Sequence, residues 1–423
     1  MKELLGDFDG ALAGAVRDEM VEMTCDLVEI PSATGEEGQI ADYVAERFRE
    51  LGMDVELQEV EPGRNNVVAR KKGGGRGKSL LFEAHFDTGM TGKDPGMPFG
   101  LLPKATIDDD GWIYGLGVSN MKSAFAAYYG AIRLFQETGI DLAGDLIVAG
   151  VVGETEKAPT DEFAGPAYRA GGWGTMYSAH HGVVADAAIL GEPTGLRIQT
   201  GNSSYVFAKV ALKGMARHTW SKEHGDDAIE KGVRVLQAFR DWEDTFAANH
   251  AHPTMGSRIG FGAIRGGNAF QPAVNPARYC NLYLDFRFPP TATIMDVQRQ
   301  IRGFLDDVED RDPELETELS FYLCRNGYEI EDSEPVVQAV DRAHVAVFGK
   351  QPSPLEPYRY DVSADTSILD EYGVPSLTYG PGGIRKDGVY DVYDQYGELI
   401  SIDNLVKCTK VYALSAADIC GTV

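Results

Sequence analysis

The stretch "SLLFEAHFD", residues 79–87, is a short apolar run that ends in two polar side chains, His85 and Asp87. A run of this length and composition is typical of a strand that is buried on both faces of a sheet. Two further runs have the same form: "DLIVAGVVGE", residues 145–154, ends in Glu154, and "DAAILGEP", residues 186–193, contains Glu192 near its end. We therefore expect three buried strands whose ends carry polar side chains.

Helical patterns precede the first of these strand runs, at residues 13–30 and 34–53, and another lies between the first and second runs, at residues 121–138. Strands that alternate with helices predict a catalytic three-layer α/β domain with a mainly parallel sheet. In such sheets, ligands bind beyond the carboxyl ends of the strands. The sequence therefore predicts that the polar strand ends meet at one site.

A different pattern begins near residue 199. Alternating strand patterns at residues 205–214, 257–267 and 278–288 combine with two helical patterns, at residues 226–246 and 293–310. This order predicts a smaller α+β lid or dimerisation domain, residues 199–317. We expect it to be inserted into a catalytic domain formed by residues 1–198 and 318–423.

Composition narrows the class of protein. The chain has 423 residues, of which 43% are hydrophobic, and 39 basic against 65 acidic residues give a net charge of −26. This charge argues against nucleic acid or an anionic membrane as a partner. No apolar run reaches the length of a membrane span, and the first residues do not resemble a signal peptide. Five scattered cysteines are typical of reduced thiols, so we expect a cytoplasmic protein.

A histidine and two glutamates at strand ends suit a divalent transition metal, and a carboxylate at such a site can act as a general base. Taken singly, each has a simpler interpretation, as a turn residue or part of a solvated acidic loop. Taken together, His85, Glu154 and Glu192 indicate a metal-dependent hydrolase. His218, in "KGMARHTW", is by itself more typical of a surface or capping histidine.

Seven motifs in order resemble one family of co-catalytic metallopeptidases and deacylases, which includes aminoacylase, acetylornithine deacetylase, succinyl-diaminopimelate desuccinylase and the glutamate carboxypeptidases. The motifs are "EAHFDTG" (83–89), "DGWIYGLGVSNMKSA" (110–124), "VVGETE" (151–156), "LGEPTG" (190–195), "KGMARHTW" (213–220), "GGNAFQPAVNP" with "LDFRFPP" (266–276 and 284–290), and "VSADTSIL" with "GVPSLTYGPGG" (362–369 and 373–383). They cover nearly the whole chain.

The resemblance implies roles for the strand-end residues. His85 and Glu192 would hold one metal, Asp87 would support His85, and Glu154 would be the general base. Asn120 occupies the place of the aspartate that bridges two metals in the family, and it would be the third metal ligand.

The resemblance also implies a homodimer or higher homo-oligomer. His218 would reach the site of the partner subunit and stabilise the oxyanion, and Arg258 would bind a substrate carboxylate.

The sequence departs from the family at the second metal. Asn120 replaces the bridging aspartate, Thr155 replaces the second glutamate of the pair, and no histidine follows His344. Aligning "DQYGELISIDNL" with the family ending puts Asp394 in the place of the last histidine ligand. An amide is a neutral and weaker ligand than a carboxylate. We therefore expect one loosely bound divalent transition metal, either manganese, zinc or cobalt.

Because the metal site differs from that of the family, we expect a reaction other than peptide hydrolysis. The expected reaction cleaves a non-peptide C–N bond of a small carboxylate substrate. The family resemblance extends to hydrolytic deamination of 5-nitroanthranilate to 5-nitrosalicylate and ammonia, a step of aromatic compound degradation that proceeds by nucleophilic aromatic substitution. An N-acyl amino acid deacylase or dipeptidase is the alternative enzyme. A non-catalytic relative that binds a small ligand at a degenerate metal site is the alternative of another class.

Overall fold

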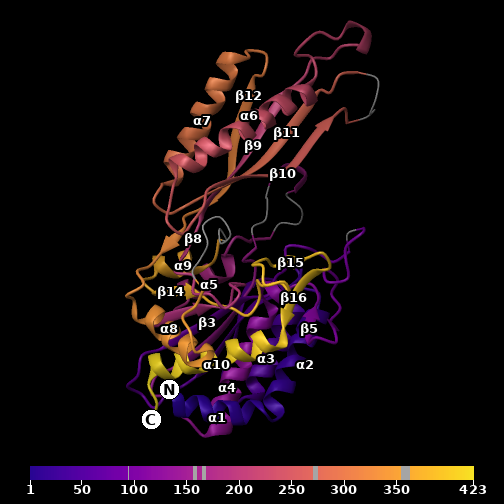
Figure 1. Cartoon of the computed structure of the whole chain (residues 1–423). Helices are drawn as coiled ribbons and strands as arrows, with labels where there is room; N and C mark the ends of the chain where they lie inside the picture. Colours follow the sequence, from indigo (N-terminus) through magenta and orange to yellow (C-terminus); the bar gives the residue numbers. More distant parts are fainter. Residues whose placement is uncertain (94, 156–159, 164–167, 270–274, 354–362) are drawn as a thin grey trace.

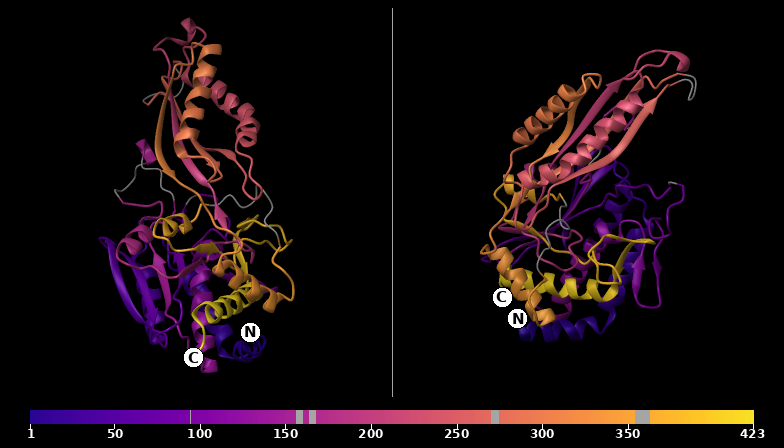
Figure 2. Two further views of the ribbon diagram at one scale, coloured as in Figure 1. Left: turned by 90° about the vertical axis from the view of Figure 1, so that its left-hand side faces the viewer. Right: turned by 45° about the horizontal axis from the view of Figure 1, so that its top comes forward.

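The computed structural model of the chain describes residues 1–93, 95–155, 160–163, 168–269, 275–353 and 363–423. A large part with a six-stranded sheet carries both termini, and a small part with a four-stranded sheet projects from it (Figure 1). The views in Figure 2 show that two long helices cover one face of the small sheet.

The six-stranded sheet is mainly parallel, with the strand order β1-β2-β6-β3-β7-β14. Strand β3 pairs in parallel with both β6 and β7, and β7 pairs in parallel with β14. Only β2 runs in the opposite direction: it pairs antiparallel with β6 and with the edge strand β1, so β1 runs in the same direction as β6. The strands are β1 (Asp54–Glu61), β2 (Arg64–Lys71), β3 (Leu80–His85), β6 (Leu146–Val151), β7 (Ala187–Leu190) and β14 (Ser376–Thr378). The three predicted strands with polar ends are therefore neighbours.

Helices cover both faces of this sheet because its side chains alternate between two apolar cores. Leu80 and Phe82 of β3 belong to the larger core, whereas Leu81 faces the smaller one. The larger core is covered by α1 (Lys2–Leu12), α2 (Ala15–Glu29), α3 (Gly38–Glu50), α4 (Ser123–Thr138), α8 (Pro335–Phe348) and α10 (Ile402–Cys420). Helix α9 (Thr366–Glu371) contributes Leu369 to the smaller core, and α5 (Trp173–His180) is in contact with α9. The expected three-layer architecture is thus confirmed.

The small sheet is antiparallel, with the order β10-β11-β9-β12. Its elements are β9 (Ser204–Lys213), α6 (Ala228–Asn249), β10 (Arg258–Gly267), β11 (Tyr279–Phe288), α7 (Ile294–Arg311) and β12 (Thr317–Arg325). The expected return to the large layer at residue 318 is wrong, because β12 pairs with β9 from Thr317 to Arg325. The free edge of β9 needs a hydrogen-bonded partner, and β12 supplies it.

Short elements complete the chain. Strands β4 (Thr106–Ile107), β5 (Trp112–Tyr114), β15 (Tyr393–Asp394) and β16 (Gly397–Ser401) form one small sheet, and β8 (Gly201–Asn202) pairs with β13 (Tyr328–Glu329). The helical turns are η1 (Val118–Lys122), η2 (Asp161–Phe163) and η3 (Thr219–Ser221). Across the described ranges, every helix is too short or too polar to traverse a lipid bilayer.

Candidate metal and catalytic site

A polar cavity of about 440 Å³ opens beyond the carboxyl ends of β3, β6 and β7. This is where a parallel sheet is expected to bind a ligand. Its wall combines residues from the large sheet, the η1 turn, the small sheet and the C-terminal hairpin. These are His85, Asp87, Thr88, Gly89, Met90, Leu116, Asn120, Glu154, Thr155, Glu192, Arg287, Ser363, Tyr393 and Glu398.

Three side chains in this wall form a candidate metal centre. His85, Glu154 and Glu192 are buried, and each offers a ligand atom that lies within 4.8 Å of those of the other two. Within the described part of the chain, no other three side chains of ligand type come as close together. A nitrogen and carboxylate oxygens in this arrangement suit a divalent transition metal.

The His85 ring is oriented so that one nitrogen faces the cavity. Its Nδ1 lies 2.9 Å from the main-chain carbonyl of Asp87, and its Nε2 lies 3.0 Å from Asn120 Oδ1. A ring that donates from Nδ1 to a carbonyl keeps its lone pair on Nε2, the form that binds a metal. Burial opposes protonation, but Glu192 and Asp87 outweigh it and raise the pKa of His85. The site therefore holds excess negative charge that a cation would balance.

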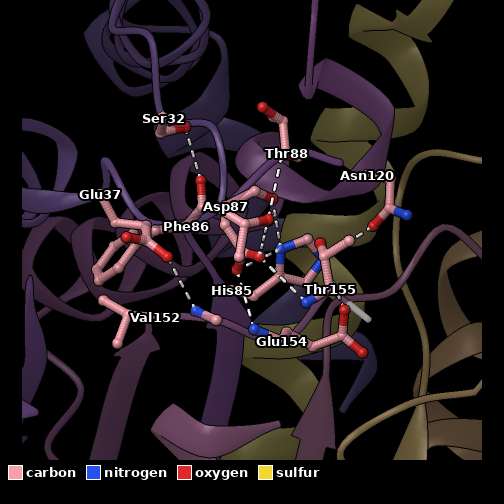
Figure 3. Close-up of polar contacts among 12 residues, drawn as sticks. Ser32, Glu37, His85, Phe86, Asp87, Thr88, Asn120, Val152, Glu154 and Thr155 are labelled. Carbon is pink, nitrogen blue, oxygen red and sulfur yellow. Dashed lines mark hydrogen bonds and ion pairs between the residues drawn. The ribbon is translucent and has the colours of Figure 1, made fainter. Parts of the chain in front are cut away.

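The Asp87 carboxylate holds the loop that carries Glu154 (Figure 3). Its Oδ1 accepts the N–H of Glu154 at 3.0 Å, and its Oδ2 accepts the N–H of Thr155 at 3.1 Å. The Thr34 hydroxyl donates to Oδ2 at 2.9 Å. Asp87 thus supports His85 through its main chain and Glu154 through its side chain.

The preceding two N–H groups of the same loop are also held by side chains. Val152 N–H donates to Asn66 Oδ1 at 3.0 Å, and Gly153 N–H donates to Glu37 Oε1 at 3.1 Å. Glu37 is itself held by the buried Arg64 guanidinium, 2.6 Å away. Four successive N–H groups, from residue 152 to 155, therefore have side-chain acceptors, which fixes where the Glu154 side chain emerges.

Asn120 lies in η1, where its main chain is held by a buried acid. Glu398 Oε2 accepts the N–H groups of Ser119 and Asn120, each at 3.1 Å. Burial raises the pKa of Glu398 to about 7. The buried Lys122 ammonium donates to two main-chain carbonyls near the C-terminal end of α2. These contacts aim the Asn120 amide at His85.

Glu398 was missed by the sequence alignment, which put Asp394 in this place. Asp394 instead accepts a hydrogen bond from the Tyr114 hydroxyl at 3.1 Å and lines a separate hollow with Lys386. The two acids lie on opposite strands of the β15–β16 hairpin, and Glu398 is the one that lines the cavity. The signal in the sequence was the lone acid in the apolar strand "GELIS", residues 397–401.

The small sheet contributes an arginine to the cavity, and it is Arg287 rather than the expected Arg258. The two are directly opposite each other on neighbouring strands, β11 and β10. Arg258 is exposed on the edge strand, whereas Arg287 lines the cavity. The Asp285 carboxylate accepts two contacts from Arg287 Nε, each at 2.9 Å, which orients the guanidinium.

His218 lies elsewhere on the small part. It is exposed, it precedes the η3 turn, and its Nδ1 accepts the N–H of Trp220 at 3.3 Å. It is not one of the described residues that line the cavity. Glu156, the third polar residue after β6, falls outside the described residues, as does part of the motif at residues 266–276.

Comparisons with known proteins agree with this architecture. Residues 81–418 match the model of peptidase family M20/M25/M40. The chain is 27% identical to the N-formyl-4-amino-5-aminomethyl-2-methylpyrimidine deformylase of Bacillus subtilis (strain 168), over 93% of each chain. It is 28% identical to the acetylornithine deacetylase of Vibrio vulnificus (strain CMCP6), over 88% of this chain and 91% of the relative.

Solved structures show the same fold. The dipeptidase Dug1p of Saccharomyces cerevisiae has a TM-score of 0.75 and 13% identity, with 99% of both chains covered. Human carnosine dipeptidase 1 has a TM-score of 0.73 and 15% identity, with 99% of this chain and 98% of the other covered. The family match over most of the chain, together with the site, shows that this protein is a metal-dependent amidohydrolase and belongs to peptidase family M20/M25/M40.

Proposed function

We propose that this enzyme hydrolyses a C–N bond of a small carboxylate substrate with one divalent transition metal. His85, Glu192 and Asn120 would hold the cation, and Glu154 would be the general base. The observation that carries the proposal is the convergence of three ligand-type side chains within 4.8 Å. The 3.0 Å approach of His85 Nε2 to Asn120 Oδ1 supports the amide as a further ligand.

We propose one cation rather than two because of the residues that would have to bind a second metal ion. Thr155 offers only a neutral hydroxyl, which is a poor ligand compared with a carboxylate. Glu398 lies at the cavity, but its Oε2 already accepts two main-chain N–H groups. Two dications close together need several anionic ligands. Of the four carboxylates in this wall, Asp87 and Glu398 already accept main-chain N–H groups, which leaves Glu154 and Glu192.

Each residue then has a chemical task. When bound, the cation acts as a Lewis acid and lowers the pKa of water. Glu154 takes a proton from the attacking water and delivers it to the leaving nitrogen. Arg287 binds the substrate carboxylate, since a guanidinium pairs with a carboxylate in two parallel hydrogen bonds.

For the substrate, we propose 5-nitroanthranilate. The water oxygen bonds to the ring carbon that carries the amino group, the C–N bond breaks, and ammonia leaves with the proton from Glu154. The negative charge that develops spreads into the ring and its nitro group, so no second cation is needed. An N-acyl amino acid deacylase is the second candidate, which is supported by the deformylase and deacetylase relatives.

Ammonia release from 5-nitroanthranilate and amine release from N-acyl amino acids, with added manganese, zinc or cobalt, test both candidates. We expect metal-dependent ammonia release in wild type and its loss in Glu154→Gln, with metal binding retained. Release of amine but not ammonia would overturn the deamination and support the deacylase. Absence of turnover on both classes with every metal would overturn the proposed reaction.

We further propose that two copies associate through the small sheet and that His218 serves the site of the partner. Apolar side chains on this part are exposed, including Trp220 at 93%, Val233 at 57% and Ile264 at 46%. Exposed apolar side chains of this size support an interaction surface. An imidazole supplied by the partner would stabilise the oxyanion of an acyl substrate or the charge on a nitro group.

A further inference from the structure

We propose that Arg325 is a positioning residue that holds the Glu154 carboxylate off the metal, so that Glu154 works as a base rather than as a ligand. This inference rests on the proposed function, because it presupposes a cation beside His85. Arg325 is the last residue of β12 and therefore belongs to the small sheet. The sequence motifs do not include it.

Arg325 contacts two acids at once. Its Nη1 donates to Asp365 Oδ1 at 2.6 Å, and its Nη2 lies 3.5 Å from Glu154 Oε1. The side chains of Arg325 and Glu154 are each 10% exposed, and that of Asp365 is 2% exposed. Because these charges are largely removed from water, their geometry is well defined and their attraction is weakly screened.

The two oxygens of Glu154 consequently have different surroundings. Oε2 lies 3.9 Å from His85 Nε2, on the side of the candidate metal centre, whereas Oε1 faces Arg325. Glu154 has a ligand-type atom within 4.8 Å of those of His85 and Glu192, so it lies close enough to join them as a ligand. A carboxylate bound to a cation is a weaker base. The pull of Arg325 on Oε1 opposes that binding.

The position of Arg325 is fixed by Asp365, which is itself held by a buried hydroxyl. The Thr175 hydroxyl lies 2.5 Å from Asp365 Oδ2 and 3.1 Å from Glu83 Oε1. Burial and the charge of Asp365 hold the pKa of Glu83 well above its usual range. The Thr175 hydroxyl thus lies between the two buried acids behind Arg325 and keeps Asp365 in place. The guanidinium carbon also lies 5.6 Å from the centre of the Tyr205 ring.

This arrangement ties the position of the base to the small sheet. Asp365 precedes α9 of the large part, while Arg325 ends β12 of the small part. The small sheet therefore contributes both the arginine that lines the cavity and the arginine that restrains the base. Their tasks differ, because Arg287 faces the substrate space and Arg325 faces Glu154.

Arg325→Met and Arg325→Lys test the inference, with Cys324→Ser as the matched control on the same strand. Cys324 is exposed, so its change should leave activity and metal binding as in wild type. In Arg325→Met we expect kcat to fall about 100-fold with KM nearly unchanged, as for a misplaced catalytic group. Arg325→Lys should regain part of this loss, because an ammonium keeps the charge but not the forked contact.

A second readout does not depend on turnover. The enzyme is loaded with Co²⁺, and its visible absorption and Co²⁺ affinity are measured without substrate. Binding of Glu154 in Arg325→Met should raise the coordination number, which weakens the visible bands, and should leave the affinity equal or tighter. The double variant Arg325→Met with Glu154→Gln should return to the spectrum of Glu154→Gln alone.

Three results would overturn the inference. They are an unchanged Co²⁺ spectrum in Arg325→Met, a rise in KM with kcat retained, and wild-type turnover in the same variant. The spectrum also separates this inference from the proposed reaction. If wild type binds Co²⁺ but turns over none of the substrates, the reaction is wrong, and the spectral comparison still decides the role of Arg325.

Discussion

At the scale of single residues, the amide of Asn120 would determine how much negative charge faces a bound cation. Its Oδ1 lies 3.0 Å from His85 Nε2, where a carboxylate would add one full charge. Glu398 holds the Asn120 main chain by accepting its N–H, so the position of the side chain does not depend on a bound metal. The main chain of the proposed ligand is thus held in place, and its side chain carries no charge.

Asn120→Asp should therefore bind metal more tightly than wild type. The substitution keeps the shape of the side chain and adds a negative charge to a buried donor set, so we expect affinity for Mn²⁺ to rise at least about tenfold. Isothermal titration of the metal-free protein with Mn²⁺ measures it. Asn120→Ala is the control and should bind more weakly. Equal affinity in Asn120→Asp and wild type would exclude Asn120 as a ligand.

At the scale of elements, a buried histidine joins α8 to the chain that follows β14. His344 Nδ1 lies 2.9 Å from the Tyr379 hydroxyl, and both residues are buried. Burial, with a smaller contribution from Lys350, lowers the pKa of His344 to about 4. The neutral ring accepts a hydrogen bond from Tyr379, so protonation of Nδ1 would remove it.

This pair predicts how stability changes with pH. Between pH 6.5 and about 4, His344 is protonated in the unfolded chain but not in the folded one. The unfolded state then binds more protons, so the free energy of unfolding falls as the pH is lowered through this window. The loss is at most about 3.5 kcal/mol, at about 1.4 kcal/mol for each unit of pKa difference.

Urea unfolding of wild type and His344→Gln between pH 4 and 7 measures this contribution. The variant removes the titrating group, so the difference in unfolding free energy between the two proteins should shrink as the pH falls. A difference that stays constant over this range would contradict the assignment. Other buried acids, such as Glu398, titrate in both proteins and cancel in the comparison.

At the scale of the whole molecule, the small sheet stands away from the large part (Figures 1 and 2). It places Arg287 at the cavity of its own chain, but leaves His218 exposed and outside that cavity. The same part carries exposed apolar side chains. A second copy that covers this surface would bring its own His218 toward this cavity, whose described lining does not include His218 of the same chain.

Mixing two inactive variants tests whether sites are shared. Glu154→Gln lacks the base, and His218→Ala lacks the donated imidazole. If each site combines Glu154 of one chain with His218 of the other, a mixed dimer has one intact site. After unfolding and refolding together, equal amounts should regain about a quarter of wild-type activity, since half of the dimers are mixed. Activity no higher than that of the separate variants would exclude shared sites.

Much of the candidate site could be predicted from local patterns. Short buried strands end at or just before His85, Asp87, Glu154 and Glu192, and parallel strands end at the same edge of a sheet. The α+β pattern of the small part was equally clear, but its end was not. The strand that finishes it, β12, had no distinctive pattern, and only its pairing with β9 identifies it.

The sequence by itself determined the layered fold and the polar strand ends, because periodicity and buried strand runs are local properties. Only the tertiary structure decided which of two cross-strand arginines lines the cavity, and which acid of a hairpin lies beside Asn120. It also brought Arg325 to Glu154, across 171 residues of sequence. These contacts depend on strand order and register, and residues far apart in the chain meet only when the sheets have formed.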